Sequence, residues 1–537
     1  MGTTHVRRTS VSLLALAICF CAFAQVPLAL GQKISSIDVG PSLPVLGPDH
    51  TTPINSYGGL TTLSDEHSTV FPPGTLPFQP NYMFLVATRT KLATDASGLV
   101  MLTNVSMPDP NGQWSLDFAP FYGLYQPFAQ PGDQNGPVFA TSMGHSNCPV
   151  SGSDPTFDLN YAAPASAFMD PTNPWDLGGG SLLLVYEGTN RCIGITGTSV
   201  DKNNFYSTIG LATSKDFGLT WPLYRANFTA LPGINPFEGP MSANGAWGER
   251  VCWGNFCPTF NALQPPEQYG RYAVSGPVTT IPEAISQSIN GLSRNTGDSE
   301  PAAFVDDVHG GSPTYVYVVH TYNPGPFPAD SQLYSFQSVE FDLSISRLAL
   351  NAGTARLHAT KWYQGNWNEP GLGSDGGGHE SLIFPHLDDK LVPYQHCLSP
   401  SQSRSSASIS FSDATNEYVL LFVCLSPTEP QAETTYQSGS VTGGAWFYST
   451  IDANVYDLSH QDQWSIPKEV TNSWSLFGPP NGCAKDFNGW YPDLMSMGSR
   501  SGHIGMEGYA FFMNGCEGAE TTGGRVYSTR TFTIKAQ

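Results

Sequence analysis

The feature that most constrains the fold is a strand-based unit that recurs along the chain. Short runs rich in β-branched and aromatic residues are bounded by Gly, Pro, Asn and Asp, and no long stretch keeps the 3.6-residue period of an amphipathic helix. Each unit has a strand that often begins with proline, a strongly apolar strand, and a third strand rich in Ser and Thr. The sequence therefore predicts an all-β protein.

Four copies of the unit are clear, and a fifth can be drawn ahead of them. The copies run through 57–63, 82–87 and 99–103; 163–170, 181–187 and 207–214; 300–306, 314–320 and 336–341; 406–413, 418–424 and 445–450; and 491–496, 509–513 and 525–534. Small sheets repeated around an axis protect their edges and bury their faces against their neighbours, which favours a five-bladed β-propeller. A six-bladed propeller and paired β-sandwiches are the alternatives, because they also show short alternating strands.

The N-terminus has the pattern of a secretory signal peptide. Arg7 and Arg8 precede an unbroken apolar stretch over 11–24 that ends in small residues. Cleavage is expected after Ala24, or as late as Gly31. No other apolar run approaches the ~20 residues of a membrane-spanning helix, so the sequence predicts an extracellular or periplasmic protein without a membrane span.

The remaining residues, 32–537, are predicted to form a single propeller domain. Two long stretches with little strand pattern, near 107–160 and 226–298, are interpreted as loop insertions. The sequence leaves the oligomeric state open.

Eight cysteines remain once Cys19 and Cys21 leave with the signal peptide. An even number in an exported protein indicates disulfides, and the simplest connectivity joins neighbours as 148–192, 252–257, 397–424 and 483–516. A zinc site at Cys252 and Cys257 would need two more soft ligands at metal-site spacing, and the sequence supplies none. No metal ligand is therefore assigned, and no cofactor is required.

Charge excludes one class of partner. The formal net charge is -21, and removal of two arginines with the signal peptide makes it more negative still, so phosphate backbones of nucleic acids would be repelled. Charged residues make up 12% of the chain, well below the usual share, so uncharged polar and aromatic groups must cover much of the surface. Such a surface suits neutral polar ligands, including carbohydrates.

One local pattern connects the chain to known propellers. Ser214–Trp221 matches the Asp-box pattern Ser-x-Asp-x-Gly-x-Thr-Trp of sialidases and other propeller families. Together with 182–188 and 209–216, it resembles the five-bladed propeller glycoside hydrolases of the arabinanase and levansucrase type, which act on furanosides and related glycans. The runs 489–496 and 527–532 are similar to the last blade of such proteins. The resemblance implies an axial funnel in which carboxylates act as acid, base and pKa modulator.

The resemblance also implies catalytic candidates. The family's general-acid glutamate often stands just ahead of a proline-containing inner strand, a position that Glu300 matches. Asp170 and Asp493, on the corresponding strands of other units, are candidates for base and modulator. Asp65 is the candidate if the first unit supplies the base, although the family's Asp-Pro opening is absent there because Glu66 follows. Each carboxylate could instead be a turn or capping residue.

Further residues are candidates for binding a sugar. Glu187 and Arg191 could bind hydroxyl groups. Tryptophans in presumed loops could stack on a sugar ring, although core burial is the commoner fate of this residue type; they are Trp175, Trp247, Trp253, Trp362 and Trp367. A glycine run brings His379 and Glu380 together, where they could meet substrate or help to hold a structural Ca²⁺. An ordinary surface loop is the alternative for that segment.

The sequence thus predicts a secreted glycoside hydrolase that acts on a poly- or oligosaccharide by carboxylate acid/base hydrolysis. A sialidase-like exo-glycosidase is one alternative, and it would gather Arg89, Arg191 and Arg530 around a substrate carboxylate. A non-catalytic carbohydrate-binding propeller is the alternative from another class.

Overall fold

The computed structural model describes about half of the chain, mostly its strands. The described residues are 32–47, 49–53, 62–63, 66–75, 81–89, 98–106, 108–116, 138–139, 161–169, 182–190, 205–214, 271–275, 295–310, 314–323, 342–350, 359–371, 378–384, 403–425, 445–471, 473, 486–516 and 526–537. Within them, every regular element is a strand except the short 3₁₀ helix Gln461–Gln463. No helix in these ranges is long and apolar enough to cross a membrane.

The described strands fall into five mainly antiparallel groups. The first contains β3 (Thr62–Leu63), β4 (Thr69–Phe71), β5 (Met83–Arg89), β6 (Gly98–Ser106), β7 (Ser115–Leu116) and β8 (Val138–Phe139). The second contains β9 (Tyr161–Met169), β10 (Leu182–Asn190), β11 (Phe205–Ser214) and β12 (Arg271–Ser275). The third contains β13 (Asn295–Val305), β14 (Tyr315–Asn323), β15 (Asp342–Ala349), β16 (Thr360–Tyr363) and β17 (Asn366–Pro370).

The last two groups complete the circuit of the chain. The fourth contains β18 (Ser403–Ser412), β19 (Glu417–Leu425), β20 (Ala445–Asp452) and β21 (Lys468–Glu469), with β23 (His503–Ile504) alongside β18. The fifth contains β22 (Asp486–Met495), β24 (Glu507–Cys516), β25 (Val526–Ala536), β1 (Ile34–Val39) and β2 (Leu43–Pro44).

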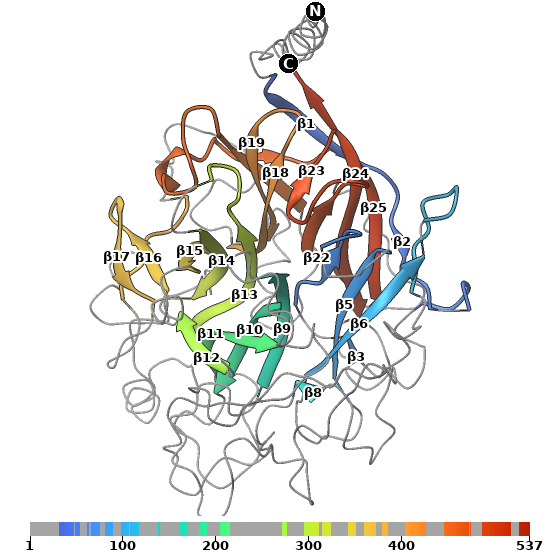
Figure 1. Cartoon of the computed structure of the whole chain (residues 1–537), viewed down its shortest axis with the longest axis horizontal. Helices are drawn as coiled ribbons and strands as arrows, with labels where there is room; N and C mark the ends of the chain where they lie inside the picture. Colours follow the sequence, from blue (N-terminus) through green and yellow to red (C-terminus); the bar gives the residue numbers. More distant parts are fainter. Residues whose placement is uncertain are drawn as a thin grey trace, which may run out of the picture.

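The groups are arranged radially, as in a β-propeller (Figure 1). One strand of each group faces the centre: β13 contacts β9 and β18, β18 contacts β22, and β9 contacts β4. A short parallel pairing between β11 and β13 joins the second and third groups into one hydrogen-bonded sheet. The prediction of an all-β propeller is confirmed, and the five groups correspond to the five predicted units. The blade count of the whole chain stays a prediction, because long segments lie outside the described residues.

The N-terminal strand closes the ring against the C-terminal strand. β1 pairs antiparallel with β25, with Ile37 opposite Ile534, and both side chains are buried in the core between the fourth and fifth groups. Figure 1 shows β1 lying beside β25 at this edge. Because the sheet takes strands from both ends of the sequence, it cannot form until the whole chain is present.

Most predicted strands lie where the pattern placed them, with three differences. The third strand of the third group is β15, whereas the predicted run 336–341 lies outside the described residues. The predicted insertion 226–298 contains β12, which pairs with the outer side of β11, and also the beginning of β13. The predicted insertion 107–160 contains the short strands β7 and β8, which both pair with β6. The signal peptide and most of the remaining residues of both insertions lie outside the described residues.

Two tryptophans predicted to lie in loops are packed instead. The Trp362 and Trp367 ring centroids lie 5.5 Å apart in the core of the third and fourth groups, and the Arg347 guanidinium lies 4.4 Å from the Trp367 ring. Burial is the commoner fate of this residue type. Cys424 is disulfide-bonded, and its predicted partner Cys397 lies outside the described residues, so the pairing stays a prediction.

Candidate active site

Three inner strands share an unusual backbone feature at the same point. Glu300 in β13, Ser406 in β18 and Tyr491 in β22 have φ angles of 53°, 52° and 57°, in the left-handed region that non-glycine residues rarely adopt. Each lies at an irregularity in the pairing of its strand with the next strand of the group. Bulges of this kind re-aim side chains, and backbone strain tends to gather at functional sites.

These bulges bring the three side chains together. Glu300 Oε2 accepts hydrogen bonds from Thr321 Oγ1 at 2.6 Å, from the Ser406 backbone N at 2.9 Å and from Ser406 Oγ at 3.1 Å. Tyr491 OH donates to Glu300 Oε1 at 3.3 Å. We call Glu300, Thr321, Ser406 and Tyr491 the Glu300 layer. It fixes the orientation of a half-buried carboxyl group at the propeller axis.

A second carboxylate lies next to this layer. Glu187 in β10 accepts hydrogen bonds at Oε1 from Ser207 Oγ at 2.7 Å and from Thr189 Oγ1 at 3.1 Å. Its Oε2 accepts a long hydrogen bond, 3.4 Å, from the backbone N of Glu300. The two half-buried glutamates therefore meet at the boundary between the second and third groups.

Asp493 lies on the same inner strand as Tyr491, but its side chain contacts a histidine and not Glu300. Its Oδ2 lies 3.1 Å from Nδ1 of His67, whose side chain is fully buried, while the Asp493 side chain is 29% exposed. The structure thus places the predicted Glu300 and Glu187 in contact, and places Asp493 apart from them with a histidine partner.

Several predicted site residues lie outside the described residues. These are Asp65, Asp170, Arg191 and Trp175, together with the Asp box after Ser214. The backbone of Arg89 is described but its side chain is not. Arg530 is buried, with its guanidinium 5.3 Å from the rings of both Trp446 and Phe512, and burial lowers its pKa to about 10. The arginine triad of a sialidase stays a prediction.

The adjacent residues His379 and Glu380 have opposite environments. The exposed His379 ring stacks on Tyr363 with centroids 5.2 Å apart, on the outer hairpin of the third group. The Glu380 side chain is fully buried, and its oxygens lie 2.7 Å from Lys361 Nζ and 2.9 Å from His320 Nε2. These placements give no support to a shared role in substrate binding.

Lys361 and His320 belong to a buried cluster of titratable side chains that also contains Asp298 and Glu380. Asp298, two residues before Glu300, lies 3.2 Å from Lys361 Nζ through Oδ2, which also accepts from Ser275 Oγ at 2.8 Å. Burial and the nearby Glu380 raise the pKa of Asp298. Burial would raise the pKa of Glu380 as well, but Lys361 and His320 outweigh it and lower that pKa. Burial opposes the charged form of His320, yet the two carboxylates raise the His320 pKa.

The same cluster has a spacing that could hold a metal ion. Ligand atoms of Asp298, His320 and Glu380 lie within 4.8 Å of one another, close enough for one ion. However, the Lys361 ammonium already bonds both carboxylates, so it supplies the positive charge that a cation would bring. The donor set therefore fits an internal ion-pair cluster. The predicted structural Ca²⁺ gains no support from Glu380.

Sequence reasoning missed most partners of Glu300. Ser406 and Tyr491 occupy the positions in β18 and β22 that Glu300 occupies in β13, and Pro492 follows Tyr491 as Pro301 follows Glu300. An alignment of the repeated units on the Glu300 position would have identified Ser406 and Tyr491 as site residues. Thr321 and His67 carry no comparable signal, because their contacts depend on how separate strands pack.

Comparisons with known proteins add little to this geometry. No protein-family model matches the chain, and no curated protein matches it. Among solved structures, levansucrase from Bacillus subtilis has a TM-score of 0.41 at 11% identity, covering 92% of this chain and 89% of that one. An N-acetylgalactosamine deacetylase from F. plautii has a TM-score of 0.38 at 8% identity, covering 93% and 96%.

A third similarity is of the same strength. The GH93 alpha-L-arabinofuranosidase of Fusarium graminearum has a TM-score of 0.36 at 9% identity, covering 92% of this chain and 97% of that one. TM-scores and sequence identities this low do not allow the fold, the substrate or the role of any residue in those proteins to be assigned to this chain. The propeller architecture therefore rests on the strand pairing of this chain.

Proposed function

We propose that the protein is a glycoside hydrolase that cleaves an O-glycosidic bond of a poly- or oligosaccharide at the Glu300 end of the axis. The observation that carries the proposal is the Glu300 carboxyl group, held on a bulged inner strand by residues of three other strands and adjoining Glu187. Two carboxyl groups from different strands are the machinery that most glycosidases use.

In the proposed reaction Glu300 is the general acid. It gives its carboxyl proton to the glycosidic oxygen, which leaves with the bonding electron pair as the C–O bond breaks. A water molecule adds its oxygen to the anomeric carbon, and its proton passes to Glu187. Proton transfer by a positioned side chain contributes about 10²–10⁴-fold to rate.

Within this mechanism, the Glu300 layer holds the acid in one orientation. Thr321 and Ser406 bond one carboxyl oxygen and Tyr491 bonds the other, so the group cannot rotate freely. Ser207 and Thr189 do the same for Glu187. Preorganised side chains lower the cost of reaching the reactive geometry. Secretion through the N-terminal signal remains part of the proposal.

The test is reducing-sugar release by the purified mature protein across a broad panel of polysaccharides and synthetic glycosides. Glu300→Gln and Glu187→Gln should each lower release at least ~10²-fold while thermal unfolding is unchanged. Glu507→Gln, an exposed glutamate on β24, is the matched control and should keep full activity. Release that survives in Glu300→Gln would refute the assignment, and no release on any substrate would favour a binding propeller.

A further inference from the structure

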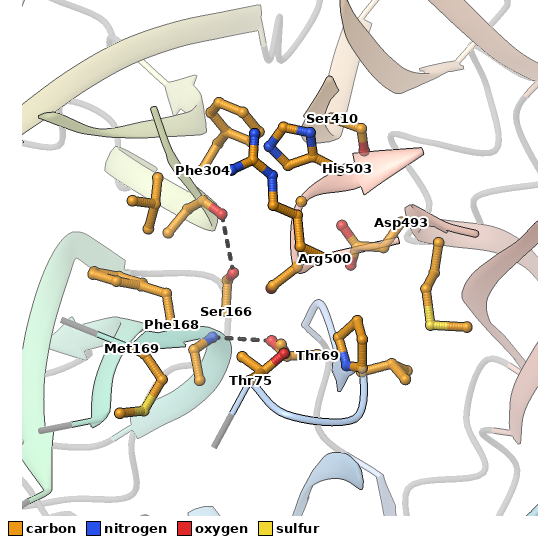
Figure 2. A pocket seen from close by; sticks show the side chains of 18 of the residues that line it. Thr69, Thr75, Ser166, Phe168, Met169, Phe304, Ser410, Asp493, Arg500 and His503 are labelled. Atoms are coloured by element: carbon orange, nitrogen blue, oxygen red, sulfur yellow. Dashed lines mark hydrogen bonds between the residues drawn. The ribbon is translucent and has the colours of Figure 1, made fainter. Parts of the chain in front are cut away.

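A cavity lies on the axis beyond the Glu300 layer. Its volume is about 330 Å³, and each of the five groups contributes to its wall, through residues that include Thr69, Ser166, Ala303, Ser410 and Asp493. Ala303, Ser410 and Asp493 come two to four positions after the bulges on β13, β18 and β22. No member of the Glu300 layer lines the cavity. It is therefore a separate compartment, which we call the axial cavity (Figure 2).

Asp493 is a carboxylate of the axial cavity wall that a histidine holds in place. His67 is fully buried, its Nδ1 lies 3.1 Å from Asp493 Oδ2, and its Nε2 has no hydrogen-bond partner among the described residues. No described residue bonds Asp493 Oδ1. Within the described part of the chain, one oxygen of Asp493 is thus held by the protein, and the other can accept from a ligand. Figure 2 shows the carboxylate pointing into the cavity from β22.

Hydroxyl groups on the opposite wall complement this carboxylate. Thr69 Oγ1 accepts a hydrogen bond from the Ala167 backbone N, so its own proton remains for a ligand. Ser166 Oγ donates to the Ala303 carbonyl at 3.5 Å, so its lone pairs remain. Phe168 adds apolar surface near Ser166, and Phe304 adds more on another part of the wall. A wall that alternates hydroxyl and apolar groups fits a ligand with hydroxyl groups on a carbon ring.

Other polar groups at the cavity pair with one another. Arg500 bonds Asp307 at 2.7 Å, and the His503 ring lies between Asp307, at 2.9 Å, and Asp413, at 2.8 Å. Among the described residues, neither Arg500 nor another arginine or lysine pairs with Asp493, whose partner is the His67 ring. A carboxylate on the wall without an arginine or lysine partner disfavours phosphates and sugar acids and favours neutral compounds.

We propose that the axial cavity binds a single neutral sugar ring, with its hydroxyl groups donating to Asp493 Oδ1. The volume lies at the lower end of the range for small-molecule sites. The inference does not depend on hydrolysis at Glu300, because no residue of the Glu300 layer lines the axial cavity. Asp493 is then a ligand-binding residue, and His67 is the residue that positions it.

The experiment is titration of the full mature chain with glucose, galactose, arabinose and fructose, followed by ligand-observed NMR and calorimetry. At least one sugar should bind to the wild type, and Asp493→Asn should weaken that binding about tenfold or more, because hydrogen bonds to a charged group are the stronger kind. Asparagine can still accept from His67, so the fold should persist. Asp462→Asn, an exposed carboxylate on the 3₁₀ helix, is the matched control and should bind normally.

A second variant tests the compartment without touching a charge. Ser410→Leu adds apolar volume to the cavity wall and should abolish binding, whereas Glu300→Gln should leave the cavity's affinity unchanged even if hydrolysis stops. Binding lost in Glu300→Gln but kept in Asp493→Asn would place the sugar at Glu300 and overturn the inference. An absence of binding in the wild type, or tighter binding of glucuronate than of glucose, would also overturn it.

Discussion

Glu300, Ser406 and Tyr491 occupy equivalent bulges in three successive groups, yet only one of them is an acid. A left-handed conformation at a non-glycine residue costs about 1–3 kcal/mol, and it persists only where the surroundings impose it. Here each strained residue contributes to the same hydrogen-bonded layer. The strain is thus associated with a site that aims side chains at the axis.

The first prediction concerns how Glu300 is oriented. Tyr491→Phe removes the hydroxyl group that donates to Glu300 Oε1 at 3.3 Å and leaves the ring in place. One hydrogen bond of this kind is worth about 1 kcal/mol, so kcat should fall roughly 5–10-fold. The fold should be unaffected, as checked by thermal unfolding. A variant with wild-type kcat would show that Thr321 and Ser406 suffice to orient the acid.

The second prediction concerns the buried ion pairs that Lys361 forms with Asp298 and Glu380. Lys361→Met leaves Asp298 and Glu380 buried without their ammonium partner, so the free energy of unfolding should fall by about 3–5 kcal/mol. Lys535→Met breaks an ion pair with Asp38 on a side chain that is 62% exposed, and should cost less than about 1 kcal/mol. Denaturant titration of both variants makes the comparison. Equal losses would contradict a special role for the buried cluster.

At the scale of the element, the repeating pattern predicted most of the strands because each apolar middle strand is buried on both faces. β14 and β19 read as continuous apolar runs for this reason, and both were predicted nearly to the residue. β12 was missed because it is a short outer strand inside a long apparent loop. Residues such as His67 and Asp298 could not be assigned to a neighbour, because their partners come from distant strands whose packing no local pattern encodes.

The third prediction concerns a link between two groups. Tyr448 in β20 donates to the Ser35 carbonyl in β1 at 3.1 Å, and burial raises its pKa to about 12. In the unfolded chain this tyrosine ionises near its ordinary value of 10.0, so ionisation stabilises the unfolded state first as pH rises. Folding stability should therefore be full below pH ~10 and should decline between about pH 10 and 12.

Tyr448→Phe removes this contribution to the pH dependence. Its stability should be lower than that of the wild type at pH 8, but should fall less steeply between pH ~10 and ~12, as measured by thermal unfolding at each pH. Tyr317, Tyr418 and Tyr509, whose pKa values burial also raises, should contribute to the remaining slope. An unchanged slope in Tyr448→Phe would refute the contribution assigned to this residue.

At the scale of the whole molecule, the chain is closed into a ring by β1. The recurring unit predicts a radial arrangement but not which strand completes the last group, since the final unit already has three strands of its own. The structure adds the N-terminal strand to that group at β25. The closure sets the relative placement of β22, which carries Tyr491, and the inner strands of the other groups.

The fourth prediction tests the closure. Ile37 is fully buried in the core between the fourth and fifth groups, so Ile37→Ala should lower the free energy of unfolding by about 2–5 kcal/mol. Ser36→Ala, on the neighbouring residue of the same strand, is the matched control and should change it by less than about 0.5 kcal/mol. Similar losses for both variants would mean that β1 is not packed as described.

The most direct test of Glu300 as the acid is the dependence of Glu300→Gln on the leaving group. Protonation matters most when the departing oxygen is a poor leaving group and little when it departs readily, as a dinitrophenolate does. Rates should be measured for wild type and Glu300→Gln on the natural glycan and on the matching dinitrophenyl glycoside. We predict a loss of at least ~10²-fold on the glycan and near-normal cleavage of the dinitrophenyl glycoside. Equal losses on both substrates, or none on the glycan, would contradict the role of Glu300.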